Sequence, residues 1–359
     1  MKIWKKVLIG VCAALGALVL VVLGYLAYVI LDYSRIPDMQ ELPIDHISTQ
    51  AEVQTDTAYT IVTQNLGFGA YTQDFTFFMD GGTQSRAKSR DSVIACITEG
   101  AQTVAALDPD FILFQEVDLD STRSHHVNQY DLLREQFGAY ASCYAVNYNS
   151  AYLMYPFHSP HGASYSSLAT FSTFDITSSM RRSFPISTSL SKFLDLDRCY
   201  SVSRIPVENG KELVLYNVHA SAYGSDDSIR HAQMSMLFAD MEAEYQKGNY
   251  VICGGDFNHD FTGDSSQKLN GADADFGWAQ PFPADMLPEG FSRCTDYSGE
   301  VLYPTCRNCD IPYEPGNFTI IVDGFIVSDN VNCIAVQNVD TAFTYSDHAP
   351  VSMTFQLKP

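Results

Sequence analysis

Basic residues are scarce in this sequence, which contains 21 Lys and Arg against 42 Asp and Glu and has a formal net charge of −21 at pH 7. Three lysines, Lys2, Lys5 and Lys6, lie at the N-terminus, and the rest of the chain shows no Lys/Arg cluster. Such an acidic chain repels nucleic acid and anionic lipid at long range. It also offers no basic groove along which a nuclease would follow many phosphates. A small basic or metal-bearing cleft can invert the field locally, so a phosphate-ester substrate is not excluded.

Several common signatures of catalysis are absent as well. The sequence contains no Gly-rich nucleotide loop, no Gly-x-Ser-x-Gly elbow and no His-Glu-x-x-His motif. It also has no internal repeat and no low-complexity tract. Any catalytic chemistry must therefore come from residues that are dispersed along the chain.

The N-terminal part contains a long uncharged run from Val7 to Leu31. This run exceeds the roughly 20 residues that a helix needs to cross a bilayer. A cleaved signal peptide would have a shorter apolar region of about 7–15 residues and a small-residue cleavage site. Cys12 lies within the run, but the residues before it suit a lipid-attachment box poorly. We therefore expect an uncleaved single-pass anchor over residues 1–31.

Lysines before this helix and none directly after it place the N-terminus in the cytoplasm. The rest of the chain is then extracytoplasmic and is held at the cell membrane. Residues 32–56 are polar and contain two prolines, so they are expected to form a stalk between the membrane and the domain.

Eight of the nine cysteines follow the apolar run, where an extracytoplasmic location would permit disulfides. Three lie in apolar helix or strand patterns and are expected to be buried thiols: Cys96, Cys253 and Cys333. Three others share a loop-like region: Cys294, Cys306 and Cys309. A zinc site there would need a fourth ligand at suitable spacing, so a local disulfide is the favoured expectation.

Strand and helix patterns alternate from residue 57 onward. Apolar helical stripes predict helices over 86–107, 124–137 and 227–246. Short apolar or alternating runs predict strands over 57–65, 111–117, 140–147, 167–174, 198–207, 211–219, 249–255, 318–327 and 333–338. Many strands with helices between them indicate an α/β fold of two packed sheets flanked by helices.

Polar side chains lie at the ends of these expected strands. Singly, each has an ordinary explanation, since Gly, Asp and Asn are also common turn formers. Together they form a set drawn only from Asn, Glu, His and Asp: Asn65, Glu116, His219, Asp256, Asn258, Asp323, Asp347 and His348. Carboxylates suit magnesium, which is held by one or two of them together with substrate phosphate oxygens. Histidines held by carboxylates can exchange protons near neutral pH. The set therefore fits metal-assisted hydrolysis of a phosphate ester.

The same residues carry a family resemblance. Asn65, "QE" ending at Glu116, "NVHA", "GGDFN", "VDGFIVS" and "SDHAPV" occur in this order. This pattern resembles the endonuclease/exonuclease/phosphatase superfamily, which includes deoxyribonuclease-type enzymes, neutral sphingomyelinases and inositol-polyphosphate phosphatases. The resemblance covers roughly residues 57–357. It implies a four-layer α/β/β/α sandwich with two mainly antiparallel sheets, a catalytic domain over 57–359, and a site at one rim of the sheets.

The resemblance also implies a role for each residue. Glu116 would be the main metal ligand, with Asn65 beside it and Asp347 supporting the metal site. Mg²⁺ is the expected ion, with Mn²⁺ and Ca²⁺ as alternatives.

The remaining five residues would act on the phosphate. Asp256 would orient or activate the attacking water, and Asn258 would bind the phosphate. His219 would contact the phosphate and protonate the leaving oxygen. His348 would be the second catalytic histidine, as base or charge stabiliser, and Asp323 would orient it.

The sequence departs from the family pattern at two places. Gly324 stands where the family often has an aromatic residue, and Thr173 follows Ser172 where a phosphate-binding cation is expected. Four arginines are candidates to replace that cation, although each is more simply a surface arginine: Arg181, Arg182, Arg198 and Arg307. Two loop histidines are candidates to line the cleft: His158 and His161. Two others are expected to be solvated helix residues: His125 and His126.

These observations predict a metal-dependent phosphoric ester hydrolase tethered to the membrane through its N-terminal helix. A lipid headgroup or small phosphoester is slightly favoured as substrate, because the loops are rich in Tyr and Phe. An extracellular metal-dependent nuclease is the first alternative, with nucleic acid as substrate only. A non-catalytic binding module on the same fold is the second.

Overall fold

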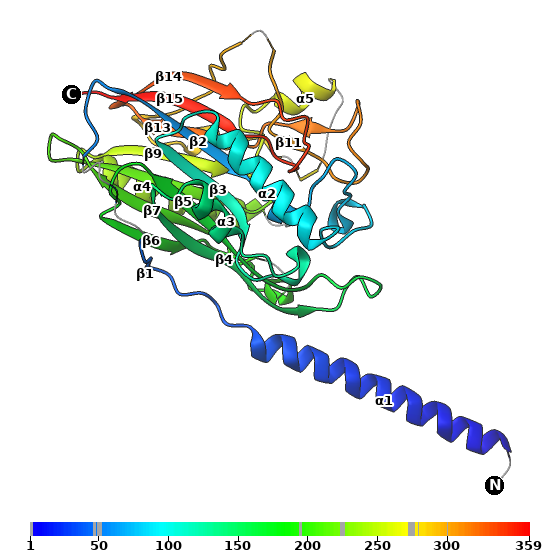
Figure 1. The fold of residues 1–359 in the computed structure, drawn as a ribbon. Helices are drawn as coiled ribbons and strands as arrows, with labels where there is room; N and C mark the ends of the chain where they lie inside the picture. The colour runs from blue at the N-terminus through cyan, green and yellow to red at the C-terminus, as the bar shows by residue number, and fades with distance from the viewer. Residues whose placement is uncertain are drawn as a thin grey trace.

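The computed structural model describes residues 3–45, 48, 52–193, 196–222, 227–271, 277–278, 280–299 and 301–359. Helix α1 (Ile3–Asp32) projects away from a domain that contains all the strands (Figure 1). The domain's other helices are α2 (Arg90–Ala105), α3 (Gln129–Gln136), α4 (Asp227–Tyr245) and α5 (Ser265–Asn270). Short 3₁₀ turns lie at Gly67–Gly69, Phe78–Asp80, Thr122–Ser124, Leu190–Phe193 and Ala284–Met286.

Within these residues the strands form two large sheets and one small one. One sheet has the order β1-β6-β7-β8-β9-β13-β10: Gln40–Glu41, Ser178–Ser183, Cys199–Pro206, Glu212–His219, Tyr250–Asp256, Asp323–Ser328 and Phe291–Arg293. The other has the order β14-β15-β2-β3-β5-β4: Val331–Asn338, Val351–Leu357, Ala58–Asn65, Phe111–Asp118, Gly162–Ser172 and Ala141–Leu153. The small sheet pairs β11 (Cys306–Arg307) with β12 (Thr319–Ile320).

Strand neighbours in the two large sheets are antiparallel except for β2 with β3 and β8 with β9. The predicted mixed fold with two mainly antiparallel sheets is therefore confirmed.

Alternating side chains build three hydrophobic layers. Successive residues of a strand point to opposite faces, so Ile61 lies in the core between the two sheets and Val62 lies against the helices outside them. In the same way Ile252 faces the inter-sheet core while Val251 faces α4. Helices α2 and α3 thus cover one sheet and α4 covers the other (Figure 1). These three cores separate the four layers of the predicted sandwich.

Several predicted element boundaries differ from the observed ones. The helix expected over 124–137 begins only at Gln129, because the Asn128 side chain caps it by accepting a bond from Asp131 N. His125 and His126 precede it with positive φ angles of 55° and 56°, so they lie in a turn and not in a helix. The strand expected over 318–327 is divided into β12 and β13.

The cysteine prediction is wrong in part. All nine cysteines lie among the described residues and all are free thiols, so the structure contains no local disulfide between Cys294, Cys306 and Cys309. Cys96 and Cys253 are buried as expected, whereas Cys333 is half-buried.

The segment expected to be a stalk packs against the domain in its described part. Strand β1 pairs with β6, and Leu42 and Val53 join the inter-sheet core. Arg181 is buried and donates through Nη1 to the carbonyl of Pro37 at 3.1 Å. These few apolar and backbone contacts hold the segment along the edge of the sheet. They could not be predicted from the polar composition of residues 32–56.

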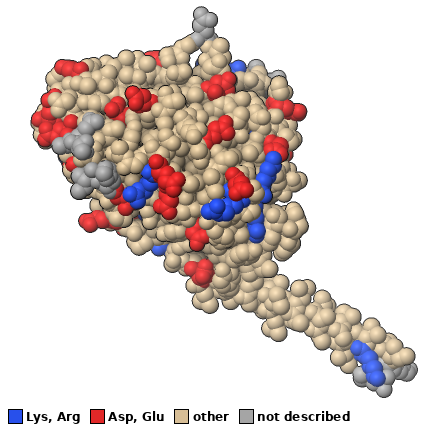
Figure 2. Space-filling view, viewed as in Figure 1, with Lys and Arg blue, Asp and Glu red and all other residues tan. Residues whose placement is uncertain are grey.

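Acidic side chains dominate the face of the domain seen in Figure 2, with fewer Lys and Arg between them. Helix α1 carries an apolar surface with almost no buried residue, and it is the single described helix that is long and apolar enough to cross a membrane. This finding fits the predicted anchor by length and composition only.

Candidate active site

Strand register gathers five of the predicted site residues at one rim. His219 ends β8 and pairs with Asp256 at the end of the parallel strand β9. Asp323 begins the antiparallel strand β13 and pairs with Asp256 from the other side. In the second sheet, Asn65 at the end of β2 pairs with Gln115, next to Glu116. Parallel strands end at the same edge of a sheet, so both sheets present polar side chains at this rim.

Asn65 connects the two sheets across the site. Its Nδ2 atom donates to Asp256 Oδ2 at 3.1 Å and lies 3.5 Å from Glu116 Oε1. Its Oδ1 atom accepts from the backbone N–H of Gly67 at 2.9 Å, which fixes the orientation of the amide.

A second polar contact joins the sheets directly beneath the site, and the sequence reasoning missed it. Gln115 Nε2 donates to Asn217 Oδ1 at 2.8 Å, and Asn217 Nδ2 donates to the carbonyl of Ala169 at 3.0 Å. Both side chains are fully buried. A paired buried polar contact specifies one arrangement of the surrounding groups, so this pair fixes how the two sheets meet below the site. The polar interruptions in the strand patterns "FQEV" and "YNVH" were the available signal.

The two glycines near the end of β9, Gly254 and Gly255, are required by close packing. Gly255 has φ +144°, and a Cβ atom there would lie 2.1 Å from the carbonyl oxygen of Val218 on β8. The chain then turns so that Asn258 N donates to Asp256 Oδ1 at 2.9 Å and Asn258 Nδ2 donates to Ala220 O at 2.9 Å. The turn therefore holds both polar side chains rigidly.

Gly324 departs from the family pattern for a similar steric reason. A Cβ atom at this position would lie 2.5 Å from Cε1 of Phe261. The ring of Phe261 thus fills the space in which a larger side chain would stand.

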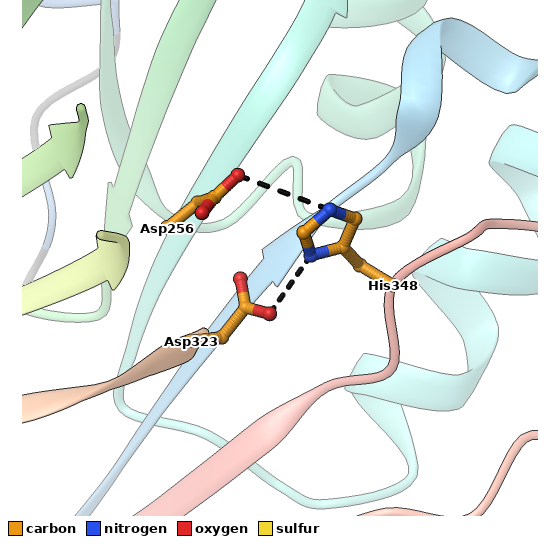
Figure 3. A group of neighbouring side chains, drawn as sticks. All are labelled: Asp256, Asp323 and His348. Carbon is orange, nitrogen blue, oxygen red and sulfur yellow. Dashed lines mark hydrogen bonds and ion pairs between the residues drawn. The ribbon is translucent and has the colours of Figure 1, made fainter. Parts of the chain in front are cut away.

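His348 lies between two carboxylates (Figure 3). Its Nδ1 donates to Asp323 Oδ2 at 2.8 Å, and its Nε2 lies 3.8 Å from Asp256 Oδ2. Burial disfavours the charged ring, but the adjacent Asp323 carboxylate outweighs it and holds the pKa of His348 well above its usual range. The hydrogen bond to Asp323 fixes the orientation of the ring, so Nε2 is the atom that faces the reacting region.

The pKa of His219 is shifted in the opposite direction to that of His348. Its Nε2 atom lies 3.4 Å from Asp256 Oδ2 and 3.9 Å from Glu116 Oε1, while Nδ1 lies 3.4 Å from Asn147 Nδ2. Burial, together with the nearby charge of Arg198, lowers the pKa of His219 well below its usual value. The ring is therefore neutral, and an amide donor at Nδ1 leaves the proton on Nε2.

Glu116 projects into the site from a β-bulge. The register between β3 and β5 shifts between Phe114 and Val117, and Glu116 has a φ of 53°. A non-glycine residue in this region is strained, and bulges often re-aim a side chain beside an active site. The carboxylate is partly exposed, with a side-chain exposure of 23%. The bulge thus turns it toward open space instead of into the sheet.

The donor set around Glu116 fits a hard divalent cation. Asp347 lies nearby and is half-buried, and its Oδ1 atom lies 3.4 Å from Ser346 Oγ. Burial raises the pKa of Asp347 to about 7, and the neighbouring charge of Glu116 also raises it. Two crowded carboxylates beside the amide of Asn65 provide the oxygen ligands that Mg²⁺ prefers, and a cation there would relieve their repulsion.

A second group of ligand atoms lies close by. One atom each of Asp256, Asp323 and His348 fall within 4.8 Å of one another. The short Asp323–His348 hydrogen bond occupies Nδ1 of the histidine, so this group fits a carboxylate–histidine pair better than a metal site.

A pocket of about 120 Å³ opens over these residues. It is lined by Glu116, His219, Asp256, Asn258, Asp347 and His348 among the predicted residues, and by Tyr148, His161, Arg123, Arg198 and Arg307. The structure thus brings the predicted residues together, with Asn65 and Asp323 directly behind the lining. His161 lines the pocket as one of the two candidate histidines, whereas His158 is exposed outside it.

Two of the four candidate arginines reach the pocket. Arg198 is 5% exposed, and among the described residues its Nε and Nη1 atoms have no hydrogen-bond partner. Arg307 is also buried, and its Nη2 donates to Thr72 O at 3.1 Å while Nε and Nη1 lack partners in the described chain. Buried polar groups are normally paired, so these donors beside the pocket are suited to an anionic ligand.

The other two candidate arginines, together with Arg123, have partners within the protein. Arg182 pairs with Asp38 and Asp240, and Arg181 donates to backbone carbonyls. Arg123 lines the pocket but forms a buried two-point ion pair with Asp118 at 2.8 and 3.1 Å. The prediction that Arg181 and Arg182 could replace the missing cation is therefore not supported by their contacts.

Comparison with solved structures shows the same fold in several proteins. An endonuclease/exonuclease/phosphatase from Beutenbergia cavernae aligns with a TM-score of 0.56 at 14% identity, covering 84% of this chain and 72% of that one. TDP2 from D. rerio, solved with a single-strand DNA product, aligns with a TM-score of 0.54 at 15% identity, covering 84% and 100%. ANGEL2, described as a 2′,3′-cyclic phosphatase, aligns with a TM-score of 0.52 at 15% identity, covering 89% and 99%.

At these sequence identities, the structural similarity supports a shared fold and nothing further. A comparison with curated proteins gave no match. The sequence itself matches the Endonuclease/Exonuclease/phosphatase family model over residues 62–348, a span that contains all eight predicted site residues. This match extends over most of the chain, and the chain belongs to the endonuclease/exonuclease/phosphatase family.

Proposed function

We propose that this chain is a membrane-tethered, divalent-metal-dependent phosphoric ester hydrolase whose catalytic domain, residues 57–359, lies outside the cytoplasm. The observation that carries the proposal is the convergence of strand ends from both sheets on one pocket, where Asn65 contacts both Glu116 and Asp256. Mg²⁺ is the proposed ion, with Mn²⁺ and Ca²⁺ as alternatives, held by Glu116 and Asp347, with Asn65 beside them in the same metal and phosphate cluster.

When bound, such an ion would neutralise charge on the phosphoryl oxygens and lower the pKa of a water molecule. The protein residues do the rest. Asp256 is held by Asn65 and by the Asn258 backbone, so its carboxylate can orient the attacking water. Asn258 Nδ2 has a second hydrogen available for a phosphate oxygen, because only one is used on Ala220 O.

The two histidines are suited to different tasks. His219 is neutral with its proton on Nε2, so it can donate to a phosphate oxygen or to the leaving group. His348 is held in its charged form by Asp323, so it can stabilise negative charge that develops in the transition state.

The electrostatics favour a small phosphoester over a long nucleic acid. The formal charge of −21 opposes long-range attraction of a polyanion, and the unpaired arginine donors lie in the pocket instead of along a groove. A metal-dependent nuclease remains the second candidate, because a single-strand DNA product occupies the D. rerio relative of the same fold. A non-catalytic module is disfavoured, since all eight residues of the site are present and in contact range.

The proposal is tested by hydrolysis of a soluble bis-aryl phosphate by the purified full-length chain. We expect turnover with Mg²⁺ and its loss in excess chelator, with recovery when the metal is restored. Turnover that continues unchanged in chelator would contradict metal assistance. A panel of plasmid DNA, sphingomyelin, phosphatidylinositols and sugar phosphates would then rank the substrate classes.

Arg198 is proposed to bind a phosphate oxygen of the substrate. Arg198→Gln should lower kcat/KM for the aryl phosphate by about 10–100-fold, because a hydrogen bond to a charged group is worth roughly 1.5–3 kcal/mol. Arg198→Lys keeps the charge but loses the planar fork, so it should recover only part of the activity.

Arg182→Gln is the matched control, since this arginine pairs with Asp38 and Asp240 outside the pocket. Equal kcat/KM values for Arg198→Gln and Arg182→Gln, measured on folded protein, would remove Arg198 from substrate binding.

A further inference from the structure

The hairpin between β4 and β5 exposes an unusual set of apolar side chains. Phe157 is 82% exposed and Tyr155 is 62% exposed, and Tyr152 and Met154 beside them are also exposed. These residues form one continuous stretch, 152–157, which we call the aromatic hairpin tip. Contiguous exposed apolar side chains on a soluble surface mark an interaction site.

The hairpin tip also lacks the acidity of the rest of the protein. Residues 136–174 contain no Asp, Glu, Lys or Arg, although the chain as a whole has 42 acidic residues. Figure 2 shows mostly uncharged surface where the domain adjoins α1, while most Asp and Glu side chains lie elsewhere on that face. The long-range repulsion that the acidic domain exerts on an anionic surface is therefore weakest here.

The hairpin contacts the end of the membrane helix. Tyr25 of α1 donates through its hydroxyl to Tyr152 O at 3.2 Å and accepts from Met154 N at 3.1 Å. Tyr28 of α1 accepts from Tyr152 N at 3.0 Å. Figure 1 shows the green hairpin beside the blue helix. The aromatic hairpin tip and the last turns of α1 thus lie side by side, at the same position along the axis of the helix.

If α1 spans a bilayer, that part of the helix lies near the bilayer surface. Tyr25 and Tyr28 precede the end of α1 at Asp32 by seven and four residues, which is about 6–10 Å along a helix. Tyrosine is enriched at membrane–water interfaces, where its ring is apolar and its hydroxyl is hydrated. If α1 spans a bilayer, the exposed rings of Tyr155 and Phe157 reach its outer interface.

The same contacts tie the pocket to the membrane end of the chain. Tyr148 and His161, on the two arms of the hairpin, line one wall of the pocket. Arg198 lines it as well, and the adjacent Asp197 accepts from Tyr33 Oη and Ile36 N, both at 3.1 Å, just after α1. Elements on two sides of the pocket are therefore fixed to the residues that leave the bilayer.

We propose that the aromatic hairpin tip inserts into the outer membrane interface and presents the pocket to phosphate esters in the headgroups of membrane lipids. The substrate class rests on the proposed function, whereas the insertion of the tip does not. A lipid phosphodiester at the surface needs no long-range attraction to the acidic domain, because α1 already holds the pocket next to it.

Insertion is tested with Phe157→Trp in full-length protein reconstituted into phosphatidylcholine vesicles. Its added fluorescence should shift to the blue and be quenched by lipids brominated in the upper part of the acyl chains. Ile334→Trp is the matched control, because Ile334 is 51% exposed on β14, at the opposite end of the domain from α1 (Figure 1). Both variants share the background of Trp4 and Trp278. Quenching of Phe157→Trp no greater than that of Ile334→Trp would overturn the proposed insertion.

The substrate class is tested with the double variant Tyr155→Ser/Phe157→Ser. Headgroup release from vesicles of phosphatidylcholine with sphingomyelin or phosphatidylinositol should fall by about tenfold, the order of effect of removing a buried aromatic side chain. Hydrolysis of the soluble bis-aryl phosphate should stay unchanged. Equal effects on both substrates would overturn the lipid assignment. Failure of the wild type on the soluble ester would instead count against the proposed function and leave the quenching result standing.

Discussion

Replacing His348 by alanine is expected to reduce the rate of bis-aryl phosphate hydrolysis by about 10²–10⁴-fold, the range for loss of a catalytic acid or base. The ring lies between Asp323 and Asp256 with Nε2 directed to the reacting region, so its removal takes away the charge that faces the phosphate. The measurement is kcat in Mg²⁺-saturated buffer, with folding checked by thermal unfolding.

The alanine variant also leaves the buried carboxylate of Asp323 without its partner, and this alone can destabilise the fold. His348→Gln is the companion variant, because its amide can still donate to Asp323 but cannot carry a proton. His126→Ala is the control, since His126 is an exposed histidine paired with Asp120 on the surface. A loss below about threefold in both His348 variants would remove this residue from acid–base or charge-stabilising chemistry.

Much of the site could be predicted from the sequence, because its residues lie at the ends of strands. Asn65, Glu116, His219 and Asp256 each follow an apolar run, and an apolar run that ends in a polar residue marks the rim of a sheet. The register of parallel β2–β3 and β8–β9 then places these residues side by side. The predicted fold class is confirmed, whereas the individual catalytic roles stay predictions.

Other features required the three-dimensional arrangement. The bulge at Glu116 depends on pairing with β5, and the pattern "LFQEVD" carries no sign of its positive φ. The Gln115–Asn217 contact joins residues that are distant in sequence, so spacing could not reveal it. The same holds for Arg198 and Arg307, which look like surface arginines until the pocket forms around them.

The net charge of the whole chain is negative, whereas the pocket is lined by positively charged side chains as well as carboxylates. The chain is acidic overall, yet Arg123, Arg198 and Arg307 all line the pocket, beside the carboxylates that we propose hold a cation. Net charge governs long-range encounter, whereas binding depends on the charges within a few ångströms. If α1 tethers the domain to a membrane, as we propose, long-range encounter becomes less important, because a substrate in the same membrane would already be concentrated near the pocket.

Replacing Glu116 by glutamine is expected to lower kcat/KM by about 10²-fold or more, because metal assistance stabilises transition-state charge by several kcal/mol. The amide keeps the size of the side chain but removes the negative charge that Glu116 directs into the pocket from its bulge. Part of the activity should return at higher Mg²⁺ concentration, so the half-activating concentration should rise relative to wild type. Glu135→Gln is the control, because Glu135 is an exposed residue of α3 outside the pocket. An Mg²⁺ titration in which Glu116→Gln matches Glu135→Gln would show that Glu116 does not hold the metal.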